Sequence, residues 1–210
     1  MDLTGNIFIR GPAGKLEALL KEPAGEIKRA VVVCHPHPLF GGTMHNKVVY
    51  RIAKTFFDSG FAALRFNFRG AGRSEGTHDA GRGEQDDLRS AVRFVEEKYR
   101  GAELWLAGFS FGAAVLLRAG CAGSVRALVA VGTPVSKYDF ASEAICPQPA
   151  LFVQGERDEF GTVGDLEKFT ASLSAQVKVI EGADHFFEGH LGELSRAVSE
   201  FIASIIIESD

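Results

Sequence analysis

The sequence has few cysteines, no long apolar run and no excess of basic residues, and each shortage excludes a class of protein. The chain has three cysteines, Cys34, Cys121 and Cys146. An odd number of cysteines without a CxxC pair indicates neither a disulfide framework nor a zinc knuckle. We therefore expect a reducing compartment. No apolar run approaches the roughly 18 residues of a membrane-spanning helix, and residues 1–8 lack the features of a secretory signal. We expect a cytoplasmic protein without a membrane partner.

Charge and composition are those of an ordinary globular protein. Lys and Arg number 23 against 27 Asp and Glu, which gives a net charge of -4 and a pI near 5.9. This balance offers no positive surface for phosphate backbones, so nucleic acid is not an expected partner. With 46% hydrophobic and 24% charged residues, disorder and collagen-like structure are excluded. At roughly 150 residues per domain, residues 1–210 are expected to form one domain with a sizeable core.

Short apolar runs alternate with segments of helical spacing. Helical periodicity occurs over positions 48–56, 88–95 and 191–205. Parallel strands need crossover connections of this length, so we expect an α/β fold with a mostly parallel open sheet and helices on both faces. The runs expected to form strands buried on both faces are Ala30–Cys34, Phe61–Phe66, Leu104–Ala107, Ala127–Val131, Ala150–Val153 and Val177–Ile180.

The first 22 residues carry a different pattern. Two short apolar runs, Ile7–Ile9 and Leu16–Leu20, are separated by Gly11, Pro12 and Gly14. This spacing predicts an antiparallel hairpin at an edge of the sheet. No internal repeat or shift in composition marks a second domain.

The pattern Gly-x-Ser-x-Gly occurs twice, around Ser74 and around Ser110. A nucleophile elbow needs a strand, a tight turn flanked by glycines, and then a helix. Ser110 follows the Leu104–Ala107 run and precedes Phe111–Arg118, which is rich in strong helix formers. Ser74 lies among glycines and polar residues without such flanks. We predict that Ser110 is a nucleophile and that Ser74 shapes a turn.

A serine nucleophile needs a histidine to accept its proton and a carboxylate to orient that histidine. In open α/β sheets, ligand chemistry gathers beyond the carboxyl ends of the strands. Asp158 and His185 each follow a predicted strand by a few residues. The chain order Ser110, Asp158, His185 is that of one serine-hydrolase architecture. We assign His185 as the base and Asp158 as the orienting acid.

Other titratable residues near these motifs receive different roles. Glu156 and Asp139 remain alternatives for the acid. Asp184 is not favoured, because the side chains of neighbouring loop residues usually diverge and it adjoins the candidate histidine. His78 lies in a polar loop and His190 at the start of the last helix, and both are expected at the solvated surface.

Metal and cofactor sites are not indicated. His35, His37 and His45 lack a carboxylate or cysteine at ligand spacing, so they are expected to pack in the loop under the site. Gly70-Ala71-Gly72 resembles the start of a dinucleotide loop, but Glu75 occupies the third glycine position and no helix follows. We expect no metal and no nucleotide cofactor.

Five motifs spread over nearly the whole chain carry a family resemblance. They are His35-Pro36-His37-Pro38, Arg69-Gly70-Ala71-Gly72-Arg73-Ser74, Gly108–Gly112, Gly155-Glu156-Arg157-Asp158 and Ala183-Asp184-His185-Phe186-Phe187. Together they resemble the α/β-hydrolase superfamily, particularly its small, lidless serine esterases of the dienelactone-hydrolase-like kind. The resemblance implies a serine hydrolase with the three roles assigned above. Dienelactone hydrolases proper have a cysteine where this chain has Ser110, so their particular lactonase activity is not implied.

The expected oxyanion loop also departs from that family. Many relatives have His-Gly there, whereas this chain has His35-Pro36-His37-Pro38, whose prolines have no N–H to donate. We expect the hole to consist of the backbone N–H groups of Phe111 and His37. The N–H groups of Leu39 and Phe40 remain alternatives for the second donor.

The segment from Gly132 to Pro149 is too short for a multi-helix cap, so we expect an open cleft. Six phenylalanines flank the motifs: Phe40, Phe109, Phe111, Phe160, Phe186 and Phe187. About half of them are expected to be core rather than cleft. We assign four of them, Phe40, Phe109, Phe160 and Phe186, to the substrate pocket.

These observations predict hydrolysis of small, soluble carboxylic esters or lactones through an acyl-enzyme. A small-molecule ester is the expected partner. An acyl thioesterase is an alternative, because the same groups serve an acyl chain on sulfur. A non-catalytic ligand-binding protein of the same fold is a further alternative.

Overall fold

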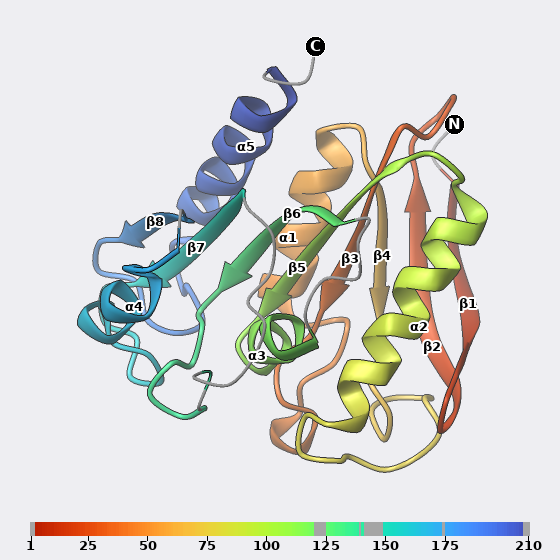
Figure 1. Ribbon diagram of the computed structural model, residues 1–210, viewed down its shortest axis with the longest axis horizontal. Helices are drawn as coiled ribbons and strands as arrows, with labels where there is room; N and C mark the ends of the chain where they lie inside the picture. The colour runs from red at the N-terminus through yellow and green to blue at the C-terminus, as the bar shows by residue number, and fades with distance from the viewer. Residues whose placement is uncertain (1–2, 120–124, 139, 141–148, 174, 208–210) are drawn as a thin grey trace.

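An eight-stranded sheet forms the centre of the structure (Figure 1). The strands β1 and β2 form an antiparallel hairpin at one edge, β2 is antiparallel to β4, and all other neighbours are parallel. The predicted α/β sheet with an antiparallel edge hairpin is confirmed. In spatial order the strands are β1 (Leu3–Gly11), β2 (Gly14–Glu22), β4 (Ala62–Phe66), β3 (Arg29–Cys34), β5 (Glu103–Phe109), β6 (Val125–Val131), β7 (Ala150–Gly155) and β8 (Ala175–Ile180).

The computed structural model describes residues 3–119, 125–138, 140, 149–173 and 175–207. Cys121, Cys146 and Asp139 lie outside these residues, as does much of the segment between β6 and β7 that is expected to be too short for a cap.

The helices cover both faces of the sheet (Figure 1). The chain passes from β3 outward to β4 and then returns across β3 to β5. Because crossover connections are right-handed, this reversal places α1 and α2 on opposite faces. It also opens a crevice beyond the carboxyl ends of β3 and β5. One face carries α1 (Lys47–Asp58) and α5 (Leu191–Ile207), and the other carries α2 (Gly83–Lys98), α3 (Phe111–Ala119) and α4 (Val163–Thr170).

Alternation along the central strands supplies a separate core to each face. In β5, Leu104 and Leu106 join the core under α2 and α3, whereas Trp105 and Phe109 join the core under α1 and α5. The indole of Trp105 meets the ring of Phe56 from α1 edge to face, with centroids 5.7 Å apart. Such aromatic pairs add to the free energy gained from apolar burial.

The outermost strand differs from its predicted environment. The sequence predicts that Val177–Ile180 is buried on both faces, and this is wrong. Among the described strands β8 pairs only with β7, so it is an edge strand. The side chain of Val177 is 36% exposed and Lys178 is exposed as well. An apolar run does not reveal whether a strand lies at the centre or at the edge of a sheet.

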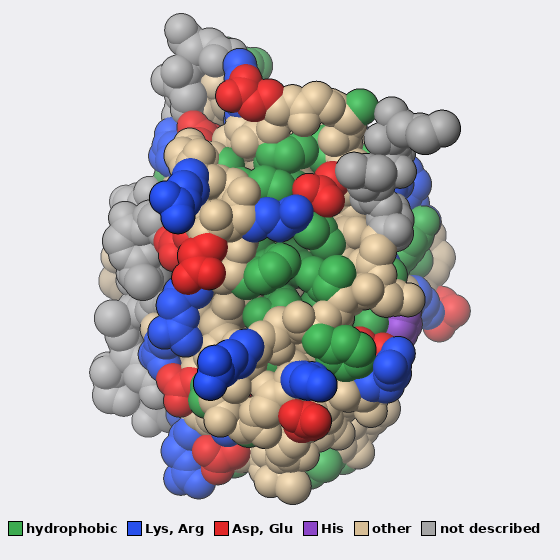
Figure 2. All heavy atoms as spheres, turned by 90° about the vertical axis from the view of Figure 1, so that its right-hand side faces the viewer, with side chains coloured by type: hydrophobic (Ala, Val, Ile, Leu, Met, Phe, Trp, Pro, Cys, Tyr) green, Lys and Arg blue, Asp and Glu red, His purple; other side chains and the backbone are tan. Residues whose placement is uncertain are grey.

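Acidic and basic side chains are interspersed on the face that is turned to the viewer in Figure 2, on the side of β1 and α2. That face therefore carries no concentrated patch of one sign, in keeping with the net charge of the chain. Within the described residues, no helix has both the length and the apolar character required to cross a bilayer.

The core contact between α1 and β5 gives a test of the packing. Replacing the fully buried Phe56 by alanine is expected to lower the free energy of unfolding by about 3–5 kcal/mol, because its phenyl ring leaves a cavity against Trp105. Tyr50→Ala on the same helix, where the side chain is 49% exposed, should cost about 1 kcal/mol or less. Urea denaturation measures both. Equal losses would contradict this description of the core.

Candidate active site

Ser110 occupies a strained turn between β5 and α3. Its φ is +54°, in the left-handed region that residues with a side chain rarely adopt. A Cβ atom on Gly112 would lie 2.5 Å from the carbonyl oxygen of Cys34, and one on Gly108 would lie 2.6 Å from the backbone of Gly112. The N–H of Ser110 donates to the carbonyl oxygen of Val131 at 2.9 Å. Glycines thus let α3 begin against β3, and β6 fixes the serine backbone.

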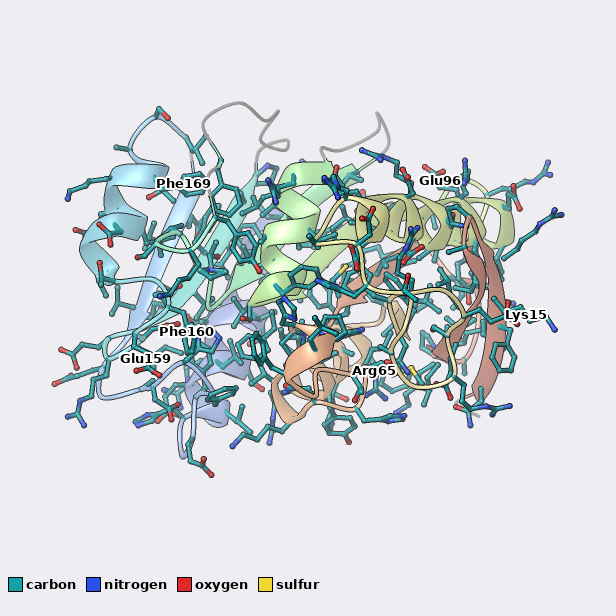
Figure 3. All side chains as sticks on the ribbon, turned by 90° about the horizontal axis from the view of Figure 1, so that it is seen from below. Lys15, Arg65, Glu96, Glu159, Phe160 and Phe169 are labelled. Atoms are coloured by element: carbon teal, nitrogen blue, oxygen red, sulfur yellow. The ribbon has the colours of Figure 1, made fainter. Side chains whose placement is uncertain are left out.

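Three predicted side chains meet at the carboxyl edge of the sheet. The Oγ atom of Ser110 lies 2.9 Å from Nε2 of His185, and Nδ1 of His185 lies 2.7 Å from Oδ2 of Asp158. His185 is 5% exposed and Asp158 is 3% exposed. Ser110 comes from the turn after β5, His185 from the loop after β8 and Asp158 from the loop after β7. Figure 3 looks onto this edge and labels Phe160, which follows Asp158 closely in the chain.

The carboxylate of Asp158 is held on both oxygens. Its Oδ1 accepts hydrogen bonds from the N–H groups of Phe160 and Gly161, at 2.9 and 3.3 Å. Its Oδ2 accepts a second bond, from Nε2 of the fully buried Gln154, at 2.8 Å. The Oε1 atom of Gln154 accepts from the N–H of Thr133 at 3.0 Å, so the amide is itself fixed. Sequence reasoning missed Gln154, although an amide inside an apolar strand must find partners when it is buried.

Aromatic rings surround the imidazole of His185. The ring centroids of Phe160, Phe109 and Phe186 lie 4.6, 5.1 and 5.1 Å from the centroid of the imidazole. Phe186 meets it edge to face. These contacts restrict rotation of the imidazole and exclude water from most of its surface.

A cavity of about 360 Å³ opens at Ser110 and has a mostly apolar wall. Phe40 lies on the short 3-10 helix η1 (Pro38–Phe40) and is 86% exposed, and Phe186 is 44% exposed. The assignment of Phe109 to the pocket is wrong, because the alternation of β5 buries this ring completely beneath His185. The lining residues are Pro36, His37, Phe40, Gly41, Gly42, Asn46, Ser110, Phe160, His185 and Phe186.

Phe111 and Phe187 are also buried, so three of the six flanking phenylalanines line the cavity and three pack in the core. The expectation that about half would be core is confirmed. The cavity also includes Asn46, which sequence reasoning did not single out. An asparagine just before a helical segment is a typical N-cap, and that signal marks the residue.

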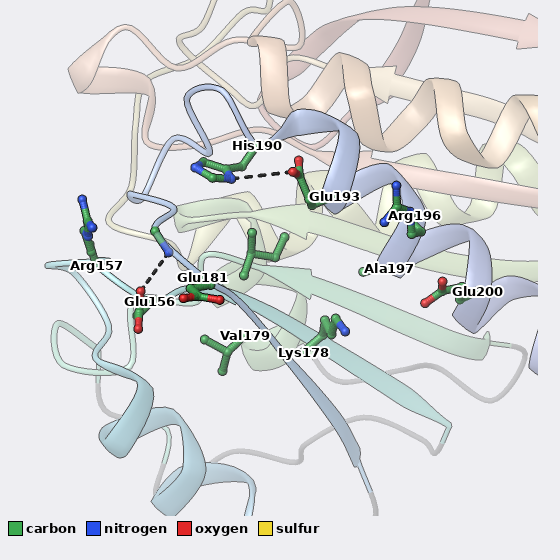
Figure 4. A pocket seen from close by; sticks show the side chains of 12 residues that line it. Glu156, Arg157, Lys178, Val179, Glu181, His190, Glu193, Arg196, Ala197 and Glu200 are labelled. Carbon is green, nitrogen blue, oxygen red and sulfur yellow. Dashed lines mark hydrogen bonds and ion pairs between the residues drawn. The ribbon is translucent and has the colours of Figure 1, made fainter.

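A larger hollow of about 630 Å³ lies between β8 and α5 (Figure 4). Charged side chains of both signs line it, and Ser110 does not. Glu156, an alternative for the orienting acid, faces this hollow and accepts a hydrogen bond from the N–H of Gly182 at 2.8 Å. His190 is half-buried there, with Nδ1 3.9 Å from Oε1 of Glu193. Because Glu156 faces this hollow and not the cavity at Ser110, it is not in contact with His185.

The second Gly-x-Ser-x-Gly serine has a structural role. The Oγ atom of Ser74 accepts from the N–H of Glu17 at 2.9 Å and donates to the carbonyl oxygen of Asn67 at 2.7 Å. These bonds fix the turn, as the sequence predicts. Asp184 is exposed and accepts from the N–H of Glu188 at 3.0 Å, so it too is used locally.

Two of the three histidines in the loop after β3, His35 and His45, have different environments. His35 is fully buried, with Nδ1 donating to the carbonyl oxygen of Pro36 at 2.6 Å and Nε2 accepting from the N–H of Phe68 at 2.9 Å. Burial lowers the pKa of His35 to about 4. His45 is exposed, contrary to the expectation of loop packing. Within the described residues, no group of three or more His, Cys, Asp or Glu side chains is arranged to hold a metal ion.

His78 is not the solvated residue that the sequence predicts. Its side chain is 13% exposed, and Nδ1 lies 2.8 Å from Oε1 of the fully buried Glu84. Its ring packs against the rings of His37 and Phe111, with centroids 4.7 and 5.5 Å apart. Burial is the main cause that lowers the pKa of His37, and electrostatic repulsion from His78 lowers it further. The buried carboxylate of Glu84, 6 positions after His78 in the chain, organises this polar loop. Composition alone does not reveal that contact.

Comparisons with known proteins agree with the observed fold. The sequence pattern described as the alpha/beta hydrolase domain matches residues 28–193. An uncharacterized protein of Rickettsia prowazekii (strain Madrid E) is 35% identical over 211 residues, covering 95% of this chain and 89% of that protein.

Two solved structures share both fold and sequence with the chain. An α/β serine hydrolase without a lid from Xanthomonas campestris has a TM-score of 0.91 at 33% identity, covering 96% of this chain and 94% of its own. An α/β serine hydrolase homologue from Coxiella burnetii has a TM-score of 0.88 at 40% identity, covering 93% and 96%. The absence of a lid in the first agrees with the open cavity at Ser110.

Burial of His35 makes the stability of the fold depend on pH. Its pKa is about 4 in the folded chain and near 6.5 when solvated, so the folded state binds fewer protons between these values. Stability is therefore full above pH 6.5 and is lost as the pH falls toward 4. We expect this residue to account for about 2–3 kcal/mol of the loss between pH 7 and pH 4.5.

Urea unfolding of the wild type and of His35→Gln at the two pH values measures this contribution. The variant should lose less free energy of unfolding on acidification than the wild type, because its amide does not titrate. Identical losses in the two proteins would contradict the role given to His35.

Proposed function

Because the chain belongs to the alpha/beta hydrolase domain family, we propose that it is a serine hydrolase that cleaves small carboxylic esters or lactones. The observation that carries this proposal is the continuous set of contacts from Ser110 Oγ to His185 Nε2 and from His185 Nδ1 to Asp158 Oδ2. A serine hydroxyl is a weak nucleophile until a base removes its proton, and this arrangement supplies the base and its orienting carboxylate.

In the proposed reaction, Ser110 Oγ attacks the carbonyl carbon of the ester while its proton moves to Nε2 of His185. The tetrahedral oxyanion collapses, the alcohol leaves with the proton from Nε2, and an acyl group remains on Ser110. Water then attacks the acyl group, again giving its proton to Nε2, and the acid is released with Ser110 restored. Asp158 keeps Nδ1 protonated throughout, so that Nε2 is free to accept.

Backbone N–H groups of Phe111 and His37 form the oxyanion hole in this proposal. Phe111 is the first residue of α3, where helical N–H groups lack partners within the helix. The rings of Phe111 and His37 pack with centroids 4.8 Å apart, which supports a fixed relation between the two residues. The alternative donors are engaged, since the N–H of Leu39 bonds to Nδ1 of His37 and that of Phe40 bonds to its carbonyl oxygen.

The cavity supports a small, uncharged substrate. Its volume of about 360 Å³ suits a small ester, and the described lining residues include no Lys, Arg, Asp or Glu. An acyl-CoA thioester carries several negative charges that would meet no basic side chain there, so the ester is favoured over the thioester.

We further propose that the chain acts as one domain in the cytoplasm. Cys34 is a buried free thiol, which agrees with a reducing compartment.

The two Gly-x-Ser-x-Gly serines give a matched test. Ser110→Ala is expected to lower kcat/KM for p-nitrophenyl butyrate by about 10⁴-fold or more, because the nucleophile is lost. Ser74→Ala should leave kcat/KM near the wild-type value but lower the free energy of unfolding by about 1–3 kcal/mol, because the N–H of Glu17 loses its acceptor. Retained activity in Ser110→Ala, or an equal loss of activity in both variants, would overturn the proposed mechanism.

A further inference from the structure

The cavity at Ser110 offers few polar groups to a substrate. Among the lining residues that the structure describes, the polar side chains are those of His37, Asn46, Ser110 and His185. Ser110 and His185 bond to each other, and Nδ1 of His37 accepts from the N–H of Leu39 at 3.3 Å. These three residues are used by the proposed reaction or by the loop, which leaves Asn46 as the polar side chain available to a substrate.

The orientation of the Asn46 side chain is fixed by α1. Asn46 is the N-cap of this helix, and its Oδ1 accepts from the N–H groups of Val48 and Val49 at 2.9 and 3.4 Å. The two N–H bonds of Nδ2 must therefore point away from the helix terminus, since oxygen and nitrogen occupy opposite sides of the amide. Among the hydrogen bonds of the described residues, none uses Nδ2 of Asn46. The residue is half-buried in the cavity wall.

We propose that Asn46 determines substrate specificity by donating a hydrogen bond from Nδ2 to an acceptor oxygen that the ester carries in addition to its reacting group. The inference rests on the proposed ester hydrolysis and names its substrate class, an uncharged ester with an ether, keto or hydroxyl oxygen within reach of Asn46. The rings of Phe40, Phe160 and Phe186 contact the hydrocarbon part. Apolar walls with a few placed polar groups are typical of small-molecule sites.

The energetic reason is the cost of an unpaired donor. A substrate made only of hydrocarbon beyond its ester group would cover Nδ2 of Asn46 and leave it without water or a partner. A site that presents a donor discriminates against analogues that lack the acceptor. A single neutral hydrogen bond of this kind corresponds to about tenfold in kcat/KM.

Two pairs of esters test the proposal, each differing by one methylene replaced with oxygen. p-Nitrophenyl methoxypropanoate and p-nitrophenyl pentanoate probe the acyl side, and ethoxyethyl acetate and pentyl acetate probe the alcohol side. The measured quantity is kcat/KM for the oxygen-containing ester divided by kcat/KM for its hydrocarbon partner. This ratio is compared between the wild type and Asn46→Ser. Serine also caps helices well, so the variant should keep the wild-type Tm.

Asn46→Ser is expected to lower the ratio about tenfold in at least one pair, with kcat/KM for the hydrocarbon ester equal to or above its wild-type value, because that ester no longer covers an unpaired donor. Asn46→Asp keeps the capping oxygen and lacks the donor, so it should lower the same ratio. Tyr50→Phe removes a polar group from the same helix outside the cavity lining and should change neither ratio.

Unchanged ratios in Asn46→Ser and Asn46→Asp would overturn the specificity role and leave the ester hydrolase standing. A uniform loss for both members of each pair, with a lower Tm, would also overturn it, because Asn46 would then serve only as a helix cap. A change of ratio in Tyr50→Phe would have the same consequence. If the wild type hydrolyses none of the four esters, both this inference and the proposed function are wrong.

Discussion

The left-handed backbone of Ser110 is the constraint on which the rest of the site depends. A serine with φ of +54° costs about 1–3 kcal/mol of strain, which persists only where the surrounding fold holds the turn. That hold comes from β5, which enters the turn, from the Val131 carbonyl at the end of β6, and from α3, which begins against the backbone of Cys34 and His35. A side chain at Gly112 would push α3 away from β3 and separate Ser110 from the loop of His37.

The remaining parts of the site follow from the order of the strands. The reversal between β4 and β5 places the loop after β3 beside the turn after β5, at the edge where ligands bind in open α/β sheets. Asp158 and His185 follow β7 and β8, which lie beyond β6 in the same direction across the sheet. Gln154 and two backbone N–H groups hold Asp158, and three phenyl rings surround His185. The hydroxyl, imidazole and carboxylate are thereby aligned before any substrate binds.

The sequence was sufficient for the fold class, the edge hairpin and the three side chains that meet at the sheet edge, because glycine spacing and strand ends are local signals. Tertiary placement was harder to predict. Whether Phe109 faces a cavity or a core depends on the register of β5, and the exposure of Val177 depends on which strand is outermost. The partners of Gln154 and of His78 lie on other segments of the chain. The helix α4 carried too short a pattern to be recognised.

The central claim is that one serine, Ser110, is made reactive by its surroundings. The most direct measurement is reaction of the folded chain with a fluorophosphonate probe, followed by proteolysis and mass spectrometric mapping of the modified peptide. The proposed mechanism predicts a single phosphonylated residue, Ser110, in the folded protein and none after denaturation. Modification at Ser74 or at another serine, or no modification of the folded chain, would contradict it.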